Sequence, residues 1–124
     1  MSGRAARTVT VAVIDDDPQL RRLLQLELED LGAKVLCWPS AEAALAELQP
    51  ATIDLLLLDV GLPGMDGLSC LRELRRRGLA GEVMVMSGQW DAAAAPEVMA
   101  AGADSYVVKT DLIERLTDLM TTPD

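Results

Sequence analysis

Short apolar runs alternate along the whole chain with segments of helical period. Five of these runs have the length of a strand: Thr8–Ile14, Lys34–Trp38, Ile53–Leu58, Glu82–Met86 and Ser105–Val108. The stretch Leu55–Leu58 carries no polar side chain, which is typical of a parallel strand covered by helices on both faces. The alternation therefore predicts a doubly wound α/β domain around a five-stranded parallel sheet.

Five segments of helical period are predicted as the helices of this fold. They cover Pro18–Leu31, Ala41–Gln49, Gly67–Arg77, a segment that ends before Gly102, and Asp111–Met120. The first is the clearest, because leucines recur along one of its faces. This apolar stripe contains Leu20, Leu23, Leu24, Leu28 and Leu31. Asp17 and Ser40 are the predicted N-caps of the first two helices, and Gly32 supplies a left-handed stop.

The composition limits what the chain binds and where it works. A chain of 124 residues that is 50% hydrophobic can bury one core, so residues 1–124 are predicted as one domain, with 121–124 either fraying or beginning a linker. The formal net charge of -9 disfavours direct contact with nucleic acid, whose phosphates would be repelled. No window stays uncharged long enough for membrane insertion. Cys37 and Cys70 form neither a metal motif nor a disulfide framework, so the cytoplasm is the expected compartment.

Charged and polar residues follow four of the five predicted strands. Asp15 and Asp16 follow the first strand, Asp59 the third, Ser87 with Gly88 the fourth, and Lys109 the fifth. Ligands of an open α/β sheet bind outside the carboxyl ends of its strands, so these residues are expected to meet at one edge. Three carboxylates packed together must hold protons or bind a cation, and hard oxygen ligands select Mg²⁺. With the ammonium, the hydroxyl and the Gly88 amide, such a site fits the charge neutralisation that phosphoryl transfer needs.

Four segments resemble, in order and spacing, the receiver domains of two-component response regulators, including the single-domain chemotaxis regulator. They are Val13–Pro18 (VIDDDP), Leu57–Gly67 (LLDVGLPGMDG), Val85–Gly88 (VMSG) and Ala101–Lys109 (AGADSYVVK). The resemblance covers nearly the whole chain. It implies a flavodoxin-like (βα)5 sandwich that acts as a phosphoacceptor switch and is not an enzyme.

The resemblance implies which residues hold the phosphoryl group and the metal. Asp59 is the implied phosphoacceptor. The implied cofactor is Mg²⁺, for which Mn²⁺ can substitute. Asp16 is its direct ligand, Asp15 a ligand through water, and Asp59 and the Gly61 backbone carbonyl are further ligands.

The resemblance also implies which residues respond to phosphorylation. Ser87 bonds a phosphoryl oxygen and swings inward on activation, and Lys109 pairs with the phosphoryl group. Tyr106 reports the state by rotating between outward and buried positions.

The implied partners are a sensor histidine kinase or phosphotransfer protein as donor, and a downstream protein or fused output domain. A phosphorylation-dependent homodimer is a further implied state. The sequence leaves open whether the chain is a complete regulator or the receiver piece of a longer transcriptional or enzymatic one. An aspartyl-phosphate hydrolase is a rival, but such enzymes carry a second aspartate where Gly61 stands. A flavin carrier is another, but Asp15–Asp17 would repel its phosphate.

Two positions depart from the family pattern. Thr110 stands where many receivers have a cis proline, so we expect either a rearranged loop at Lys109–Thr110 or a cis bond. Pro96 follows a run of alanines, and it predicts a fourth helix that is short, late-starting or kinked, with an unusual partner interface.

Three further features lie outside the family motifs. Leu26 is predicted to face solvent, and we hypothesise that with the flanking Arg22 it forms part of a kinase docking surface. Trp90 is expected to report Mg²⁺ or phosphorylation by its fluorescence. The arginines of the third helix are interpreted as a solvated face with favourable charge at the helix end. These are Arg72, Arg75, Arg76 and Arg77.

Overall fold

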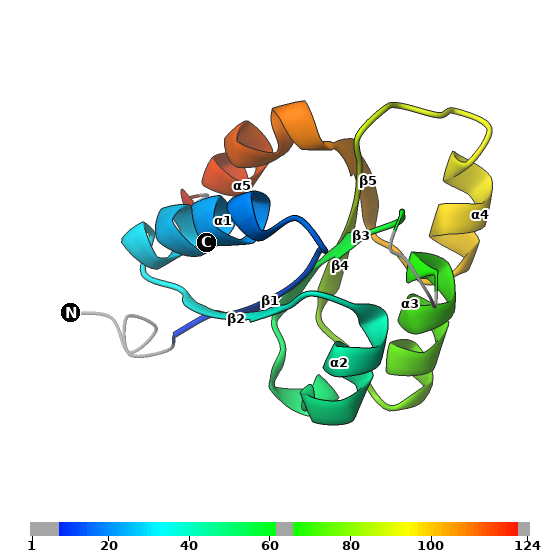
Figure 1. The fold of residues 1–124 in the computed structure, drawn as a ribbon, viewed down its shortest axis with the longest axis horizontal. Helices are drawn as coiled ribbons and strands as arrows, with labels where there is room; N and C mark the ends of the chain where they lie inside the picture. The colour runs from blue at the N-terminus through cyan, green and yellow to red at the C-terminus, as the bar shows by residue number, and fades with distance from the viewer. Residues whose placement is uncertain (1–7, 62–65, 122–124) are drawn as a thin grey trace.

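Five parallel strands form one sheet in the computed structural model, which describes residues 8–61 and 66–121 (Figure 1). The strands are β1 (Thr10–Ile14), β2 (Lys34–Trp38), β3 (Leu55–Asp59), β4 (Glu82–Ser87) and β5 (Ser105–Val108). Their order across the sheet is β2-β1-β3-β4-β5, and every neighbouring pair is parallel. The predicted doubly wound fold is confirmed. β3 and β4 extend as far as Asp59 and Ser87, so both residues belong to the ends of strands.

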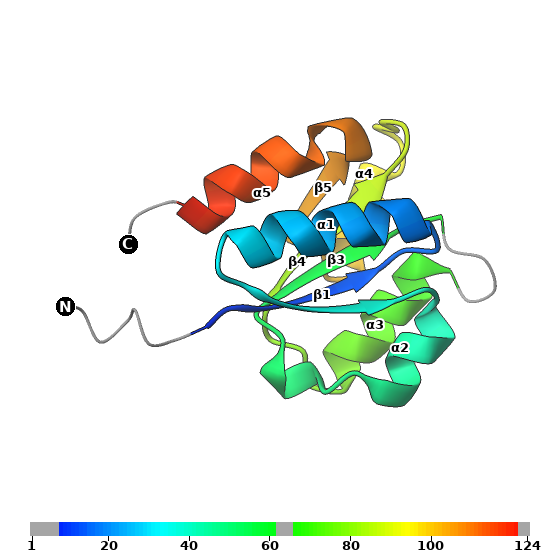
Figure 2. The ribbon, with the colours of Figure 1, turned by 60° about the vertical axis from the view of Figure 1, so that its left-hand side comes forward.

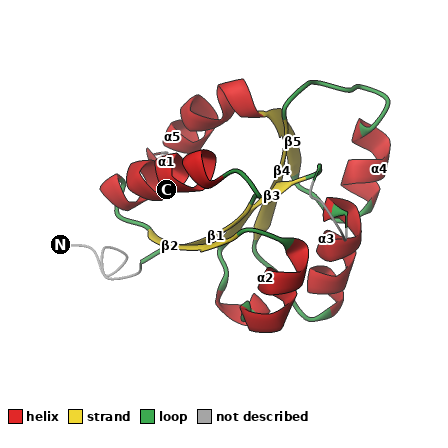
Figure 3. Ribbon diagram, in the orientation of Figure 1, coloured by secondary structure: helices red, strands yellow, loops and turns green. Residues whose placement is uncertain are grey.

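Helices cover both faces of the sheet. They are α1 (Pro18–Asp30), α2 (Ala41–Glu47), α3 (Gly67–Arg76), α4 (Ala95–Ala100) and α5 (Leu112–Thr121). Figure 2 shows α1 and α5 together on one face, with α2 and α3 on the other, and Figure 3 gives the same division by element type with α4 beside α3. Side chains alternate along each strand, so two apolar cores form, one under each layer. Leu56 and Leu58 belong to one core, whereas Leu55 and Leu57 belong to the other.

Side-chain caps fix where three of the helices begin. Asp17 accepts a hydrogen bond from the Gln19 amide at 2.9 Å, and Ser40 accepts one from the Ala43 amide at 3.1 Å, as the sequence predicted. Asp66 caps α3 in the same way. Each cap occupies an amide that the first turn of a helix leaves without a partner.

Helix α4 is short and begins late. Its six residues begin only at Ala95, and Pro96 stands in its first turn, where the missing amide costs little. The N-cap position, Ala94, offers no side-chain hydrogen bond. The predicted short, late-starting helix is therefore what forms.

The predicted apolar stripe of α1 needs one correction. Leu24 and Leu28 are fully buried, but Leu23 is 44% exposed. A stripe drawn from spacing alone is wider than the line that touches the sheet. Leu26 is 55% exposed, as predicted.

Arg75 corrects the interpretation of the arginine cluster as a solvated face. Its guanidinium donates to the backbone carbonyls of Leu79, Gly81 and Gly102 at 2.7–3.1 Å. It also forms an ion pair with Asp104, whose carboxylate accepts the Val83 amide at 2.8 Å. Arg75 thus joins the end of α3 to the start of β4 and to the turn after α4.

No membrane-spanning helix occurs among the described residues, because none of the helices there is both long enough and apolar enough.

Candidate functional site

Two buried carboxylates lie side by side at the carboxyl edge of the sheet. Asp15 follows β1 and Asp59 ends β3, and these two strands are direct neighbours, with Ile14 paired to Leu58. Asp15 is fully buried and Asp59 is 6% exposed. The exposed Asp16 joins them, and one carboxylate oxygen from each of the three lies within 4.8 Å of the others.

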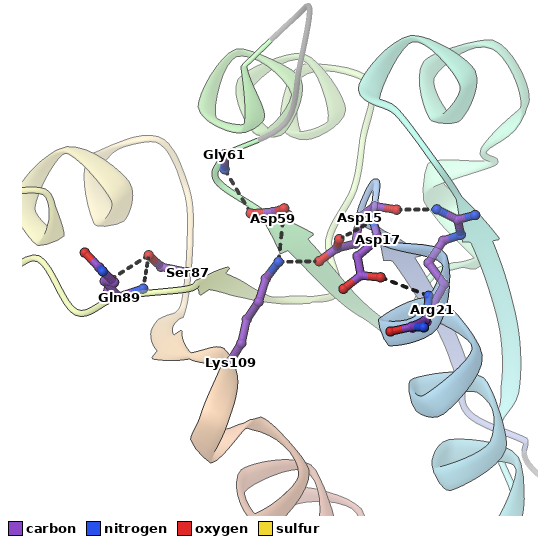
Figure 4. Close-up of polar contacts among 9 residues, drawn as sticks. Asp15, Asp17, Arg21, Asp59, Gly61, Ser87, Gln89 and Lys109 are labelled. Atoms are coloured by element: carbon purple, nitrogen blue, oxygen red, sulfur yellow. Dashed lines mark hydrogen bonds and ion pairs between the residues drawn. The ribbon is translucent and has the colours of Figure 1, made fainter.

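Lys109 reaches from the end of β5 to both buried carboxylates (Figure 4). Its Nζ lies 2.9 Å from Asp15 Oδ2 and 3.2 Å from Asp59 Oδ2. All peptide bonds of the described residues are trans, including Lys109–Thr110, and Lys109–Asp111 form a 3₁₀ helix. Of the two expectations for this loop, the cis bond is therefore wrong, and the rearrangement of the loop stays a prediction.

Both the carboxylate and the backbone of Asp15 form hydrogen bonds that fix its position. Its Oδ1 accepts the Asp17 amide at 2.8 Å, and its own amide donates to the Trp38 carbonyl at 3.2 Å. The Arg21 guanidinium donates to the Asp15 carbonyl at 2.8 Å. Sequence reasoning missed Arg21, because a helix arginine facing back to its own loop looks like any exposed arginine in the sequence.

Asp59 is held from the loop that follows it. Its Oδ1 accepts the Gly61 amide at 2.9 Å, so Gly61 meets the site through its nitrogen. The predicted ligand role of the Gly61 carbonyl stays a prediction. Gly67, the first residue of α3, packs so closely that a Cβ there would lie 2.5 Å from the Asp59 carbonyl oxygen. Only glycine lets α3 begin this near the end of β3.

Burial sets the electrostatics of this cluster. It raises the pKa of the Asp15 carboxyl, and the Asp17 amide and the Lys109 ammonium offset only part of the effect. Burial opposes the charge on Lys109, but contacts with Asp15 and Asp59 outweigh it, so the pKa of Lys109 is raised. With one ammonium among three carboxylates, the site keeps an excess of negative charge.

The donor set fits a hard divalent cation. Asp15 Oδ2 is buried, and although it pairs with the ammonium, no donor among the described residues gives it a well-directed hydrogen bond. Asp16 and Asp59 bring further carboxylate oxygens within reach of one ion. Mg²⁺ is bound in proteins through one or two carboxylates with water and phosphate oxygens completing the shell.

Ser87 lies at the end of β4, on the other side of Asp59 from Asp15. Its hydroxyl donates to the Gln89 carbonyl at 2.6 Å, and the Gln89 amide lies 3.3 Å from the same oxygen (Figure 4). Gly88 is exposed, with nothing within 4 Å of the position that a Cβ would take. The structure thus places Ser87 and Gly88 at the predicted edge but directs the Ser87 hydroxyl along its own loop.

Tyr106 is half-buried in β5 and stacks on Trp90. The two ring centroids are 4.9 Å apart, and the ring planes meet at 30°. The sequence placed both residues near the site. It gave no sign of the stack, because the course of the loop after β4 decides it.

One family model matches most of the chain. The sequence pattern of the response regulator receiver domain matches residues 11–121. The transcriptional regulatory protein AruR of Pseudomonas aeruginosa is 41% identical over 121 residues, which cover 89% of this chain and 48% of that protein. The sensor histidine kinase GacS of Pseudomonas protegens is 34% identical over 114 residues, 88% of this chain and 12% of the kinase.

A solved structure has the same fold. The chemotaxis protein CheY4 of Vibrio cholerae superposes with a TM-score of 0.84 at 24% identity, covering 92% of this chain and 97% of that one.

The chain belongs to the response regulator receiver domain family. It is a receiver domain, homologous to the receivers of two-component response regulators and of sensor kinases. The chain spans about half the length of AruR and of several other regulators that it matches.

Proposed function

We propose that this receiver accepts a phosphoryl group on Asp59, with Mg²⁺ bound by Asp15, Asp16, Asp59 and the Gly61 carbonyl. Mn²⁺ substitutes for Mg²⁺ in the same oxygen site. The observation that carries the proposal is the position of Lys109 Nζ, 2.9 Å from Asp15 and 3.2 Å from Asp59. The Lys109 ammonium lies beside two buried carboxylates at the carboxyl edge of the sheet, where it can also pair with the oxygens of a phosphoryl group on Asp59.

The donor in this proposal is a phosphohistidine of a sensor histidine kinase or phosphotransfer protein. A carboxylate oxygen of Asp59 attacks the phosphorus atom as the phosphorus–nitrogen bond breaks. The bonding electrons leave with the imidazole nitrogen, which takes up a proton, and Asp59 becomes an acyl phosphate. Lys109, Ser87 and the Gly88 amide bind the phosphoryl oxygens. Mg²⁺ held by the three carboxylates would supply positive charge that offsets the negative charge of the phosphoryl group.

The outcome of this transfer is a switch. A phosphoryl group adds negative charge and acceptor oxygens next to Lys109 and Ser87, and it shifts an existing equilibrium by its different affinity for the two states. Ser87 turns toward it and Tyr106 changes position. The domain is a regulator with slow self-dephosphorylation.

The output of the switch belongs to the same proposal. AruR and other relatives extend far beyond the matched region, and this length supports a proposal in which the receiver acts on an output domain fused to it. A separate downstream protein or a phosphorylation-dependent homodimer is the alternative. We place the domain in the cytoplasm, where the free thiols of Cys37 and Cys70 stay reduced.

Acetyl phosphate labelling tests the acceptor. The parent is expected to gain one phosphoryl group by intact mass only when Mg²⁺ is present, and Asp59→Asn is expected to gain none. Asp17→Asn is the matched control, because it removes a neighbouring acidic charge while asparagine still caps α1. Labelling of Asp59→Asn at the parent level would overturn the assignment.

Leu26 is the proposed contact for the kinase. It is 55% exposed, Leu23 beside it is 44% exposed, and both lie on α1, the helix that begins at the site. Leu26→Ala is expected to slow labelling from the cognate kinase and to leave labelling from acetyl phosphate unchanged. Equal transfer from the kinase to both proteins would remove Leu26 from the docking surface.

A further inference from the structure

The loop between β4 and α4 is held at two neighbouring points. At the first, Ser87 Oγ bonds the Gln89 carbonyl at 2.6 Å. At the second, the Trp90 ring stacks on Tyr106 with centroids 4.9 Å apart. Gln89 and Trp90 are consecutive residues, so the two contacts fix the same short piece of main chain.

The first contact excludes another use of the Ser87 hydroxyl. A serine hydroxyl has a single proton to donate, and here that proton goes to the Gln89 carbonyl. Donation to a phosphoryl oxygen on Asp59 requires this bond to break. The bond and the phosphoryl contact therefore belong to two different states of the loop.

The second contact favours the state in which Ser87 bonds Gln89. Trp90 is 57% exposed, and its ring lies against the half-buried Tyr106 instead of standing free in water. Tyr106 is paired in the sheet with Val85, two residues before Ser87, so the stack closes the loop back onto its own starting point. Stacked aromatic rings attract each other beyond the apolar area they bury.

We propose that Trp90 is a positioning residue that restrains the switch of this receiver. Its stack on Tyr106 holds the loop where Ser87 bonds Gln89 and so opposes the engagement of Ser87 with a phosphoryl group. By linkage, phosphoryl binding at Asp59 weakens the stack to the same degree. The inference rests on the proposed function of Asp59. It predicts that loss of the Trp90 ring strengthens the binding of a phosphoryl group at that site.

Beryllofluoride, a phosphoryl mimic, tests the restraint with Mg²⁺ present. Its affinity is measured by fluorine NMR, which does not depend on tryptophan signals. Trp90→Ala is expected to bind about two- to tenfold more tightly than the parent, the range that one aromatic stack supplies. Trp90→Phe keeps a stacking ring, so its affinity is expected to lie close to that of the parent. In a Tyr106→Ala background, Trp90→Ala is expected to have no further effect.

The direction of the change separates a restraint from simple damage, because a loop that merely loses order would bind beryllofluoride less tightly. A second readout uses Trp38→Phe, in which Trp90 is the only tryptophan left. Acrylamide is expected to quench Trp90 more strongly once beryllofluoride binds. Unchanged or weaker binding by Trp90→Ala, with normal binding by the parent, overturns the restraint alone. A parent that neither binds beryllofluoride nor accepts phosphate overturns the proposed function, and the restraint with it.

Discussion

The ends of β1 and β3 hold their side chains in a different way from the end of β4. Asp15 and Asp59 are buried, and their carboxylates are tied to Lys109 and to the amides of Asp17 and Gly61. At β4 the Ser87 hydroxyl bonds the Gln89 carbonyl of its own exposed loop, and the helix that follows has one fully buried residue, Val98.

The contrast teaches where rigidity is placed in this receiver. The region that we propose to accept the phosphoryl group is organised before any ligand arrives, which lowers the cost of reorganisation during transfer. The region that we propose to respond is held by a few weak contacts, and its state can change for a small free energy. Four predictions follow from the comparison: one compares the two regions as wholes, and three change single residues, in order of decreasing expected effect on stability.

Amide hydrogen exchange compares the two regions directly. Helix α3 has ten residues with five buried, whereas α4 has six residues, no side-chain cap and a single buried residue. Amides of α4 are therefore expected to exchange about tenfold faster than those of α3, or more. Equal protection of the two helices, measured by mass spectrometry or NMR, would contradict the division into a rigid and a yielding region.

Removal of Lys109 tests the rigid side. In Lys109→Met, Asp15 and Asp59 lose the cation that balances their buried charge, and the free energy of unfolding is expected to fall by about 2–3 kcal/mol without Mg²⁺. Added Mg²⁺ is expected to restore part of this loss, because a second cation then occupies the carboxylates. Lys34→Met is the control, since Lys34 is exposed at the start of β2. Equal urea unfolding curves for both variants would contradict the prediction.

Arg75→Met tests the hydrogen bonds by which Arg75 holds the turn after α4. It removes hydrogen bonds to three backbone carbonyls, and the expected loss is about 2 kcal/mol of stability. Arg76→Met is a matched control on the same helix, because Arg76 is 72% exposed and pairs only with Glu73 among the described residues. Its stability is expected to stay close to that of the parent. Chemical denaturation of the two variants decides between an anchor and a solvated face.

Asp66 gives the smallest effect and a pH dependence of known sign. Hydrogen bonds from the Ser69 amide and hydroxyl hold the pKa of Asp66 below its usual value of 3.8. A lowered pKa means that the contribution of Asp66 is present above pH 3.8 and is lost as the pH falls through its folded pKa. Asp66→Asn is expected to keep the neutral-pH stability, and Asp66→Ala to lose about 1 kcal/mol. Carboxyl groups titrate between about pH 5 and pH 2. If the parent and Asp66→Asn lost stability equally over that range, the prediction would be contradicted.

The sequence was sufficient for the fold and for the position of the carboxylates. Alternating apolar runs set the strands, and the carboxyl ends of parallel strands must meet, so Asp15, Asp59 and Lys109 were expected together. The inward turn of Arg75 was not predictable, because its partners are carbonyls whose positions exist only after α3, β4 and the turn after α4 have packed. The Trp90 stack depends in the same way on the course of a loop.

Arg75 also gives α4 a fixed pivot. Its guanidinium binds the Gly102 carbonyl just past the end of the helix, while the beginning of α4 follows the loop that contains Ser87 and Trp90. If the loop shifted while the Gly102 contact held, the helix would turn about its last residues. Six helical residues span about 9 Å, so the displacement would be greatest at Ala95 and smallest at Gly102. A partner protein whose binding depends on the orientation of α4 would therefore be expected to contact the N-terminal end of the helix, near Pro96.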